Sequence, residues 1–221
     1  PPPGYFQRVR EICDRYDVHL IYDEIITGMG RTGEWFAAQT FGVAPDILCC
    51  GKGFSGGYAP LSAMIVRDDL YMEGFWGDDG EEIHFAHGHT YGANPVSSAA
   101  GLAVLEVVER DKLIERGRET GEHIRHRLGC EVAALGILGE VRGRGALTGV
   151  AFVQDMDTMT PFPDDRLFGK KVEARLLDRG LILRCDPHWI AFAPPLCMTI
   201  AEADEMVDVF VECVKAERGG E

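Results

Sequence analysis

The first 66 residues alternate between apolar patterns of helical spacing and apolar runs of strand length. The apolar positions of the first predicted helix, at 4–16, are Phe6, Val9, Ile12, Cys13 and Tyr16. Three apolar runs of strand length follow, namely VHLIYDE (18–24), DILCCGK (46–52) and LSAMIV (61–66). A glycine-rich loop at 26–33 and a short helix at 35–41 separate the first two runs. This order of helices and strands favours an α/β domain with a largely parallel sheet.

The remainder of the chain predicts a different architecture. Residues 71–92 are polar and rich in Gly, Asp and His, which indicates a long loop. Beyond it, the pattern predicts helices at 95–110, 112–128, 164–179 and 201–217, and strands within VRGRGALTGVAFV (141–153), LILR (181–184) and WIAFAP (189–194). We therefore expect residues 1–110 to belong to one domain, and residues 111–221 to form a connecting helix and a small α+β domain.

Composition and charge exclude several classes of protein. The 221 residues carry a formal net charge of −14 without a basic run, so a nucleic acid is not an expected partner. No apolar run approaches the roughly 20 residues that span a bilayer, so no membrane association is expected. Seven cysteines without a C-x-x-C pair are typical of reduced thiols, which favours a cytoplasmic protein and predicts no zinc site.

The chain opens with Pro1 inside an ongoing pattern, PPPGYFQRVREICDRY. This opening indicates a piece of a longer protein, and a processed N-terminus is the alternative. A piece of this kind could be inactive by itself.

Asp23 and Lys52 are the two candidates for chemistry, because each follows an apolar strand and adjoins a glycine-rich loop. Ligands of open α/β sheets bind beyond the carboxyl ends of the strands. A lysine buried there would have a lowered pKa and act as an amine nucleophile. A carboxylate nearby would suit a pyridine nitrogen. An ordinary salt bridge between the two residues is the alternative reading.

Five ordered segments resemble class III aminotransferases. They are YDEIITGMGRTG (22–33), PDILCCGKGFSGGYAPLSA (45–63), HGHTYGANPVSSAAGLAVLE (87–106), RGRGALTGVAF (142–152) and LILRCDPHWIAFAPPLCMTIAEADEMV (181–207). The resemblance implies a pyridoxal 5'-phosphate (PLP) transferase of fold type I, with part of the large domain and its mostly parallel sheet, followed by the small α+β C-terminal domain. The N-terminal half of the family pattern, which supplies most of the phosphate cup, is absent from this chain.

The same resemblance assigns roles to three residues near the strand ends. It implies that Lys52 is the catalytic lysine, which holds PLP as a Schiff base and later moves a proton between substrate and cofactor. Asp23 is expected to pair with the pyridinium nitrogen. Ile25 is expected to pack against one face of the ring, a role compatible with a place in the strand core.

Two further residues match the family pattern. Thr90 is expected to donate to the cofactor phosphate across a dimer interface, and its alternative role is to cap the helix predicted at 95–110. Arg184 aligns with an arginine that binds a substrate carboxylate in many relatives. Its alternative is an exposed arginine at a strand end.

Other polar residues of these segments have supporting or no expected roles. Glu24 is expected to support the site through hydrogen bonds, and Arg31 to order its loop. His84, His87 and His89 form an H-x-x-H-x-H cluster, but the family uses no metal there, so we predict no metal site.

The resemblance favours one reaction within the family. Thr27 occupies a position at which acetylornithine-type relatives usually carry glutamine, so the TGMGRTG loop is more similar to the ω-amino acid and amine:pyruvate group. We expect a transaminase that moves an amino group from an ω-amino acid or amine to a 2-oxo acid such as pyruvate, acting as a homodimer with its site at the interface. Diaminopelargonate aminotransferases, aminomutases, decarboxylases and a non-catalytic folded module remain alternatives, and the sequence identifies neither the donor nor the pathway.

Overall fold

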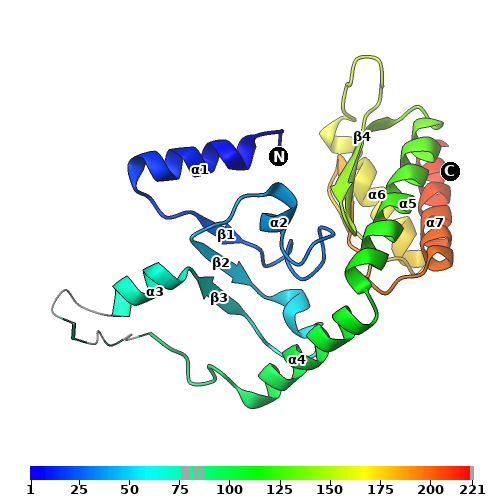
Figure 1. Cartoon of the computed structure of the whole chain (residues 1–221). Coiled ribbons are helices and arrows are strands. Elements are labelled where there is room, and N and C mark those ends of the chain that lie inside the picture. Colours follow the sequence, from blue (N-terminus) through cyan, green and yellow to red (C-terminus); the bar gives the residue numbers. More distant parts are fainter. Residues whose placement is uncertain (76–79, 82–83, 85–86, 220–221) are drawn as a thin grey trace. The chain divides into compact units, whose positions relative to one another are not determined.

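The computed structural model describes residues 1–75, 80, 81, 84 and 87–219, and these residues divide into two compact units (Figure 1). The first unit comprises residues 1–29 and 34–111, and the second comprises residues 30–33 and 112 onward. The Gly30–Gly33 segment lies in sequence between two stretches of the first unit, but it packs with the second unit.

The first unit is built on a three-stranded sheet in the order β1 (Ile21–Asp23), β2 (Ile47–Cys50) and β3 (Ala63–Val66). β1 and β2 are parallel, whereas β3 is antiparallel to β2. The sheet is therefore mixed in the described residues, and the largely parallel sheet predicted from the sequence is wrong for this chain. Its helices are α1 (Tyr5–Tyr16), α2 (Ala37–Phe41), the 3-10 helix η1 (Lys52–Ser55), α3 (Asp68–Phe75) and α4 (Pro95–Arg110). The predicted order of helices and strands up to Val66 is confirmed, although each strand is shorter than its apolar run.

The loop predicted over 71–92 is wrong at its beginning. α3 continues to Phe75, and two acids in its first turn, Asp68 and Asp69, suit the positive end of the helix dipole. The composition of the segment concealed this helix because glycine and aspartate are typical of loops. The prediction for 76–79, 82–83 and 85–86 lies outside the described residues.

Asp46, which directly precedes β2, binds α1, the residue before β1 and the residue after β3. Its Oδ2 accepts hydrogen bonds from Arg10 Nη1 of α1 at 2.8 Å and from the Leu20 N–H at 2.7 Å. Its Oδ1 accepts from Arg67 Nη1, directly after β3, at 2.5 Å. Burial alone would raise the pKa of Asp46, but the Leu20 N–H and the Arg10 guanidinium hold that pKa below its ordinary value of 3.8.

Replacing Asp46 with asparagine is expected to lower the free energy of unfolding at pH 7 by about 2–4 kcal/mol, because two arginines lose their buried partner. A carboxyl group with a lowered folded pKa stabilises the protein above its unfolded pKa, about 3.9, and loses that contribution as the pH falls further. The difference between wild type and Asp46→Asn should therefore shrink at pH 3. Urea unfolding followed by circular dichroism measures both values.

Asp14→Asn is the matched control, because Asp14 pairs with the same Arg10 at 2.7 Å but its side chain is 65% exposed. Its expected effect is below about 1 kcal/mol at either pH. Equal effects of the two substitutions at pH 7 would contradict the role given to Asp46.

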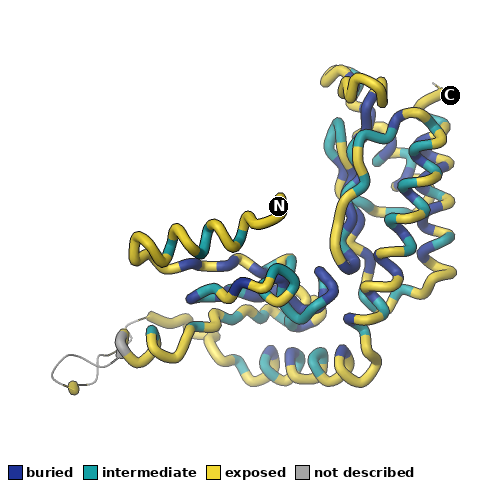
Figure 2. The backbone as a smooth tube through the Cα atoms, turned by 45° about the horizontal axis from the view of Figure 1, so that its top comes forward, coloured by how far each residue is buried: buried dark blue, intermediate teal, exposed yellow. Residues whose placement is uncertain are grey.

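In its described residues, the second unit packs three α-helices and one 3-10 helix with a four-stranded antiparallel sheet. The strand order is β4 (Leu138–Arg144), β5 (Leu147–Phe152), β7 (Trp189–Phe192) and β6 (Arg184–Cys185). Its helices are α5 (Leu113–Ala133), the 3-10 helix η2 (Asp164–Arg166), α6 (Phe168–Asp178) and α7 (Ile200–Gly219). Figure 2 shows that buried positions recur along these elements.

Two predicted elements of this unit differ from the structure. The strand predicted at 181–184 is largely wrong, because β6 contains only Arg184 and Cys185. The helix predicted at 164–179 begins at Phe168, after the separate 3-10 turn η2. Leu167 lies between them with a φ of 50°, a left-handed conformation that interrupts a continuous α-helix.

Phenylalanine rings in contact with one another form the centre of this unit. The rings of Phe162 and Phe168 stack with centroids 4.4 Å apart, and those of Phe192 and Phe210 meet edge to face at 4.9 Å. All four side chains are buried, and they join β7, α6, α7 and the chain before η2. This core buries most of the large apolar side chains of the chain's second half.

The Gly30–Gly33 segment enters the second unit through close contacts that exclude side chains. A Cβ atom on Gly121 of α5 would lie 1.8 Å from the Gly145 carbonyl oxygen. Gly145 has a φ of 52°, and a Cβ atom there would lie 2.4 Å from the Gly33 nitrogen. Three backbone segments therefore meet where α5, the β4–β5 turn and the Gly30–Gly33 segment approach one another.

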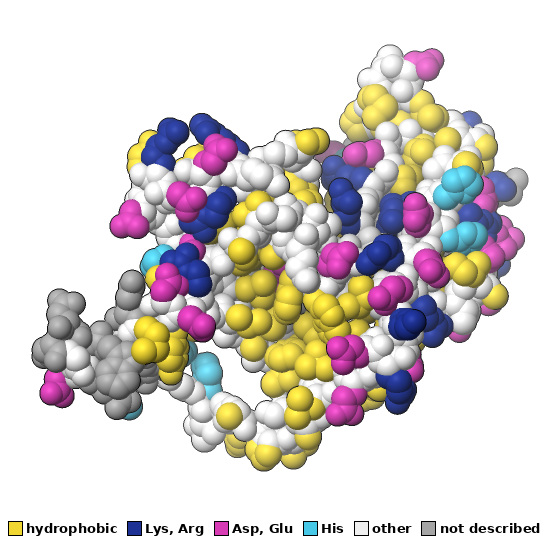
Figure 3. All heavy atoms as spheres, viewed as in Figure 1, with side chains coloured by type: hydrophobic (Ala, Val, Ile, Leu, Met, Phe, Trp, Pro, Cys, Tyr) yellow, Lys and Arg dark blue, Asp and Glu magenta, His cyan; other side chains and the backbone are white. Residues whose placement is uncertain are grey.

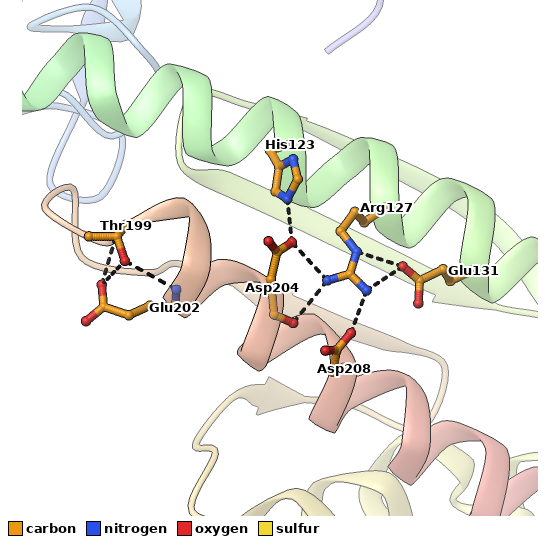
Figure 4. A network of polar contacts seen from close by, with 7 residues as sticks. All are labelled: His123, Arg127, Glu131, Thr199, Glu202, Asp204 and Asp208. Carbon is orange, nitrogen blue, oxygen red and sulfur yellow. Dashed lines mark hydrogen bonds and ion pairs between the residues drawn. The ribbon is translucent and has the colours of Figure 1, made fainter.

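A network of charges joins α5 to α7 (Figure 4). Arg127 donates to Asp208 Oδ1 at 2.6 Å, to Glu131 Oε1 at 2.7 Å and to Asp204 Oδ1 at 3.0 Å. His123 Nε2 also contacts Asp204 Oδ1, at 2.6 Å. The side chain of Arg127 is only 19% exposed, so water screens these interactions incompletely.

Replacing Arg127 with methionine is expected to lower the free energy of unfolding by about 1–3 kcal/mol, because three carboxylates lose their shared cation. The matched control is Arg8→Met, since the single ion pair between Arg8 and Glu11 is 60% and 62% exposed. That control should change the free energy by less than about 0.5 kcal/mol. Urea unfolding measures both, and similar values would show that the network contributes no more than a surface ion pair.

No helix in the described part of the chain is long and apolar enough to cross a membrane.

Candidate active site

Two adjacent parallel strands bring Asp23 and Lys52 to the same edge of the first unit's sheet. Asp23 ends β1 and pairs in register with Cys49 of β2, and the Glu24 N–H donates to the Cys49 carbonyl at 2.8 Å. β2 ends at Cys50, and Lys52 follows after a single glycine. The structure thus places both residues at the carboxyl ends of strands, as the sequence predicts.

Lys52 has an unusual backbone conformation and a free amine. Its φ is 44°, in the left-handed region that non-glycine residues rarely occupy, and such backbone strain concentrates at functional sites. The side chain is exposed, so the burial expected from the sequence is absent in this chain. Among the described residues, none forms a hydrogen bond or ion pair with its amine.

Asp23 is also exposed and has one carboxylate oxygen available. Its Oδ1 accepts a hydrogen bond from the Ile25 N–H at 3.1 Å, whereas Oδ2 has no hydrogen-bond partner within the described part of the chain. Asp23 and Lys52 do not form an ion pair with each other, so the ordinary salt bridge considered from the sequence is wrong. Both groups are free to contact a ligand.

The alternation of side chains along the strands separates the exposed and buried faces of this sheet. Tyr22 and Leu48, which pair in register, are buried. Asp23 and Cys49, the next pair along, therefore share the opposite face, where Asp23 is exposed. The carboxylate points to the open side of the sheet.

Ile25 lies next to Gly51, the residue before Lys52. It is half-buried, and a Cβ atom on Gly51 would lie 3.2 Å from its Cδ1. Ile25 thus contacts the residue before Lys52, an arrangement compatible with a role in the core and with contact to a ligand.

Thr90 lies in the turn before α4, where its side chain is exposed. It does not cap α4, because Asn94 Oδ1 accepts hydrogen bonds from the Val96 N–H at 3.0 Å and the Ser97 N–H at 3.2 Å. The alternative reading of Thr90 as an N-cap is therefore wrong. Its hydroxyl has no partner among the residues that the structure describes.

Arg184 belongs to the second unit, where it opens β6. Its side chain is exposed, and the guanidinium carbon lies 5.8 Å from the centre of the Trp189 ring. No carboxylate of the described residues pairs with it. The contact predicted between Arg184 and a substrate carboxylate stays a prediction.

Arg31 orders the Gly30–Gly33 segment within the second unit. Its Nη1 donates to the carbonyl oxygens of Ala146 at 3.1 Å and Pro194 at 2.5 Å, and its own carbonyl accepts from the Ala146 N–H at 3.0 Å. Burial lowers the pKa of Arg31. The sequence predicts that Arg31 orders its loop, but partners more than 100 residues away could not be read from it.

Two histidines of the predicted cluster, His87 and His89, lie next to each other. The rings of His87 and His89 meet edge to face with centroids 5.4 Å apart. Where the structure describes the chain, no three of its His, Cys, Asp and Glu residues converge to hold a metal ion.

Apolar side chains remain uncovered on the first unit. Figure 3 shows them gathered around its sheet and α4, and those more than 45% exposed include Ile21, Met64, Ile65, Val96 and Leu102. A hollow of about 790 Å³ lies over one sheet face, lined by His19, Ile47, Met64, Val66, Asp68, Leu70 and Tyr71. Large exposed apolar surfaces usually mark interfaces.

Comparison with known proteins identifies the family. The model of the family described as aminotransferase class-III matches residues 1–214. "Probable aminotransferase Rv3329" of Mycobacterium tuberculosis is 42% identical, over 99% of this chain and 47% of its own length. The adenosylmethionine-8-amino-7-oxononanoate aminotransferase of Methanocaldococcus jannaschii is 37% identical, over 97% of this chain and 47% of its own length.

Solved structures agree with this comparison. The (S)-enantioselective omega-transaminase of Thermomicrobium roseum superposes with a TM-score of 0.87 at 35% identity, covering 100% of this chain and 47% of its own. The chain belongs to the class III aminotransferase family. The predicted fold class, an α/β transferase of fold type I, is confirmed, and the chain spans about half the length of the relatives that it matches.

Proposed function

We propose that the complete protein carrying this chain is a PLP-dependent aminotransferase in which Lys52 binds the cofactor. The observation that carries the proposal is the strained, unpartnered Lys52 two residues beyond the end of β2, beside the strand that ends in Asp23. The family match supports the same reaction class. We further propose that the first unit is the C-terminal part of the large PLP-binding domain, and that the second contains the interdomain helix and the small domain.

The side chains present suit PLP. An amine without a partner can bind the aldehyde carbon, and the free Asp23 oxygen can accept a hydrogen bond from a pyridinium nitrogen. The exposed hydroxyl of Thr90 can donate to a phosphate. Ile25 offers an apolar surface next to Gly51, and the glycine leaves this surface open.

Each residue then has a defined task. PLP, when bound, supplies an electron-accepting ring. Asp23 would keep the ring nitrogen protonated, and Lys52 would carry a proton to and from the substrate carbon. Arg184 is proposed to bind a substrate carboxylate, since a guanidinium suits bidentate contact with one.

We infer that the amino donor is an ω-amino acid or amine and that the acceptor is a 2-oxo acid such as pyruvate. The similarity to an omega-transaminase supports this substrate class, as does Thr27 in place of glutamine. The similarity to adenosylmethionine-8-amino-7-oxononanoate aminotransferases favours synthesis of a diamine as the second candidate. The uncovered apolar surface supports a homodimer with its site at the interface, and the reduced thiols favour a cytoplasmic protein.

A panel of amino donors tests this proposal on the complete protein. Each ω-amino acid or amine is supplied with pyruvate and PLP, and alanine formation is measured. S-adenosylmethionine with 8-amino-7-oxononanoate forms a separate arm. Alanine production supports the first assignment and diamine production the second. Absence of both products and of PLP binding would favour a non-catalytic folded module.

A further inference from the structure

We propose that Glu24 is a positioning residue that holds the Asp23 carboxylate in place against PLP, an inference that rests on the proposed function. Glu24 follows Asp23 directly, at the end of β1, and its side chain is only 2% exposed. The two adjacent acids therefore have opposite environments, one open to a ligand and one enclosed by the protein.

The buried carboxylate has three hydrogen-bond donors. Glu24 Oε1 accepts from the Ala38 N–H at 2.7 Å, and Oε2 accepts from the Ala37 N–H at 2.7 Å and from the Thr27 hydroxyl at 2.9 Å. Ala37 and Ala38 are the first residues of α2, where backbone N–H groups lack partners within the helix. Glu24 thus ties the strand end to a helix 13 residues further along the chain.

The backbone of Glu24 is fixed as well. Its N–H donates to the Cys49 carbonyl at 2.8 Å, and its carbonyl accepts from the Gly28 N–H at 3.0 Å. A Cβ atom on Gly28 would lie 2.8 Å from that carbonyl oxygen, so only glycine allows this approach. Every polar group of Glu24 is therefore bonded, and the peptide that links it to Asp23 has little freedom.

Asp23 itself lacks comparable restraints. Within the described residues, its side chain has a single hydrogen bond, from the Ile25 N–H. Its position depends on the backbone that Glu24 anchors, because rigid supporting contacts set the geometry of a functional group. If the Glu24 anchor is lost, the Asp23 carboxylate moves relative to the ring nitrogen.

Glu24→Gln tests this role, because an amide nitrogen cannot accept hydrogen bonds and at least one of the three donors loses its acceptor. Three quantities are measured on the complete protein, namely the PLP dissociation constant by visible absorbance, the pH midpoint of the bound PLP absorption, and the melting temperature. Glu24→Gln is expected to weaken PLP binding by roughly tenfold or more and to shift the pH midpoint. Thr27→Val, which removes one donor and keeps both N–H bonds, should have a smaller effect.

Asp46→Asn is the matched control, since it also alters a buried carboxylate of the first unit that three donors hold. It should lower the melting temperature and leave the pH midpoint unchanged. Glu24→Gln with unaltered PLP affinity and midpoint would overturn the proposal, whatever its melting temperature. A wild-type protein that binds no PLP would overturn the proposed function and this inference together.

Discussion

Replacing Lys52 with alanine is expected to lower turnover by the complete protein at least about 10³-fold. On the proposed function, the substitution removes the amine that would bind PLP and the group that would move the proton at the substrate carbon. Alanine provides neither function, so raising the substrate concentration should not restore the rate. Steady-state assays of alanine formation from the best amino donor and pyruvate measure the loss.

Lys112→Ala is the matched control for this experiment. Lys112 also has a positive φ, 51° against 44° for Lys52, so alanine meets similar backbone strain at both positions. Lys112 precedes α5 and lies at no strand end. Its substitution should leave turnover within about twofold of wild type, because changes away from special features usually have small effects. Comparable losses of turnover in both variants would show that turnover depends on the backbone conformation and not on the Lys52 amine.

Replacing Asp23 with asparagine should lower kcat/KM about 10²-fold or more. Asparagine keeps the side chain's size and can still accept from the Ile25 N–H, but it has no negative charge to stabilise a protonated ring nitrogen. The ring then accepts electrons less well, and the proton transfer at the substrate carbon slows. Single-turnover absorbance measurements separate this step from cofactor binding.

Asp155→Asn is the control for the hydrogen bond that Asp23 accepts from the backbone two residues further on. Asp155 Oδ1 accepts from the Asp157 N–H at 2.8 Å, the same spacing of two residues as between Asp23 and Ile25. Because Asp155 is exposed and lies in the second unit, its substitution should leave kcat/KM nearly unchanged. An Asp23→Asn variant as active as this control would contradict the role of Asp23.

The sequence predicted those helices and strands whose signals lie within the element itself or directly beside it. Apolar runs marked β1 and β2, and the acids and lysine that follow them marked the strand ends where Asp23 and Lys52 lie. α4 was predicted at its observed bounds, and it begins with proline, a residue common in the first turn of helices. Its cap was not predicted, because the sequence analysis considered Thr90 and the structure shows Asn94. These signals act within a few residues of each other.

The features that the sequence did not reveal depend on distant partners. The P-D pair before β2 matched the family motif, but only the structure shows that Asp46 joins α1 to the strands. Arg31 likewise binds carbonyls of residues 146 and 194. Lys52 is exposed although its place after an apolar run predicted burial, because a strand pattern does not encode which elements cover the end of the strand.

The most direct test of the central claim is chemical attachment of the cofactor. The complete protein is loaded with PLP, reduced with borohydride and digested, and its peptides are examined by mass spectrometry. The proposed site predicts a pyridoxyl adduct on the peptide that contains Lys52. An adduct on another lysine, such as Lys112 or Lys170, or no adduct on a protein that binds PLP, would contradict it.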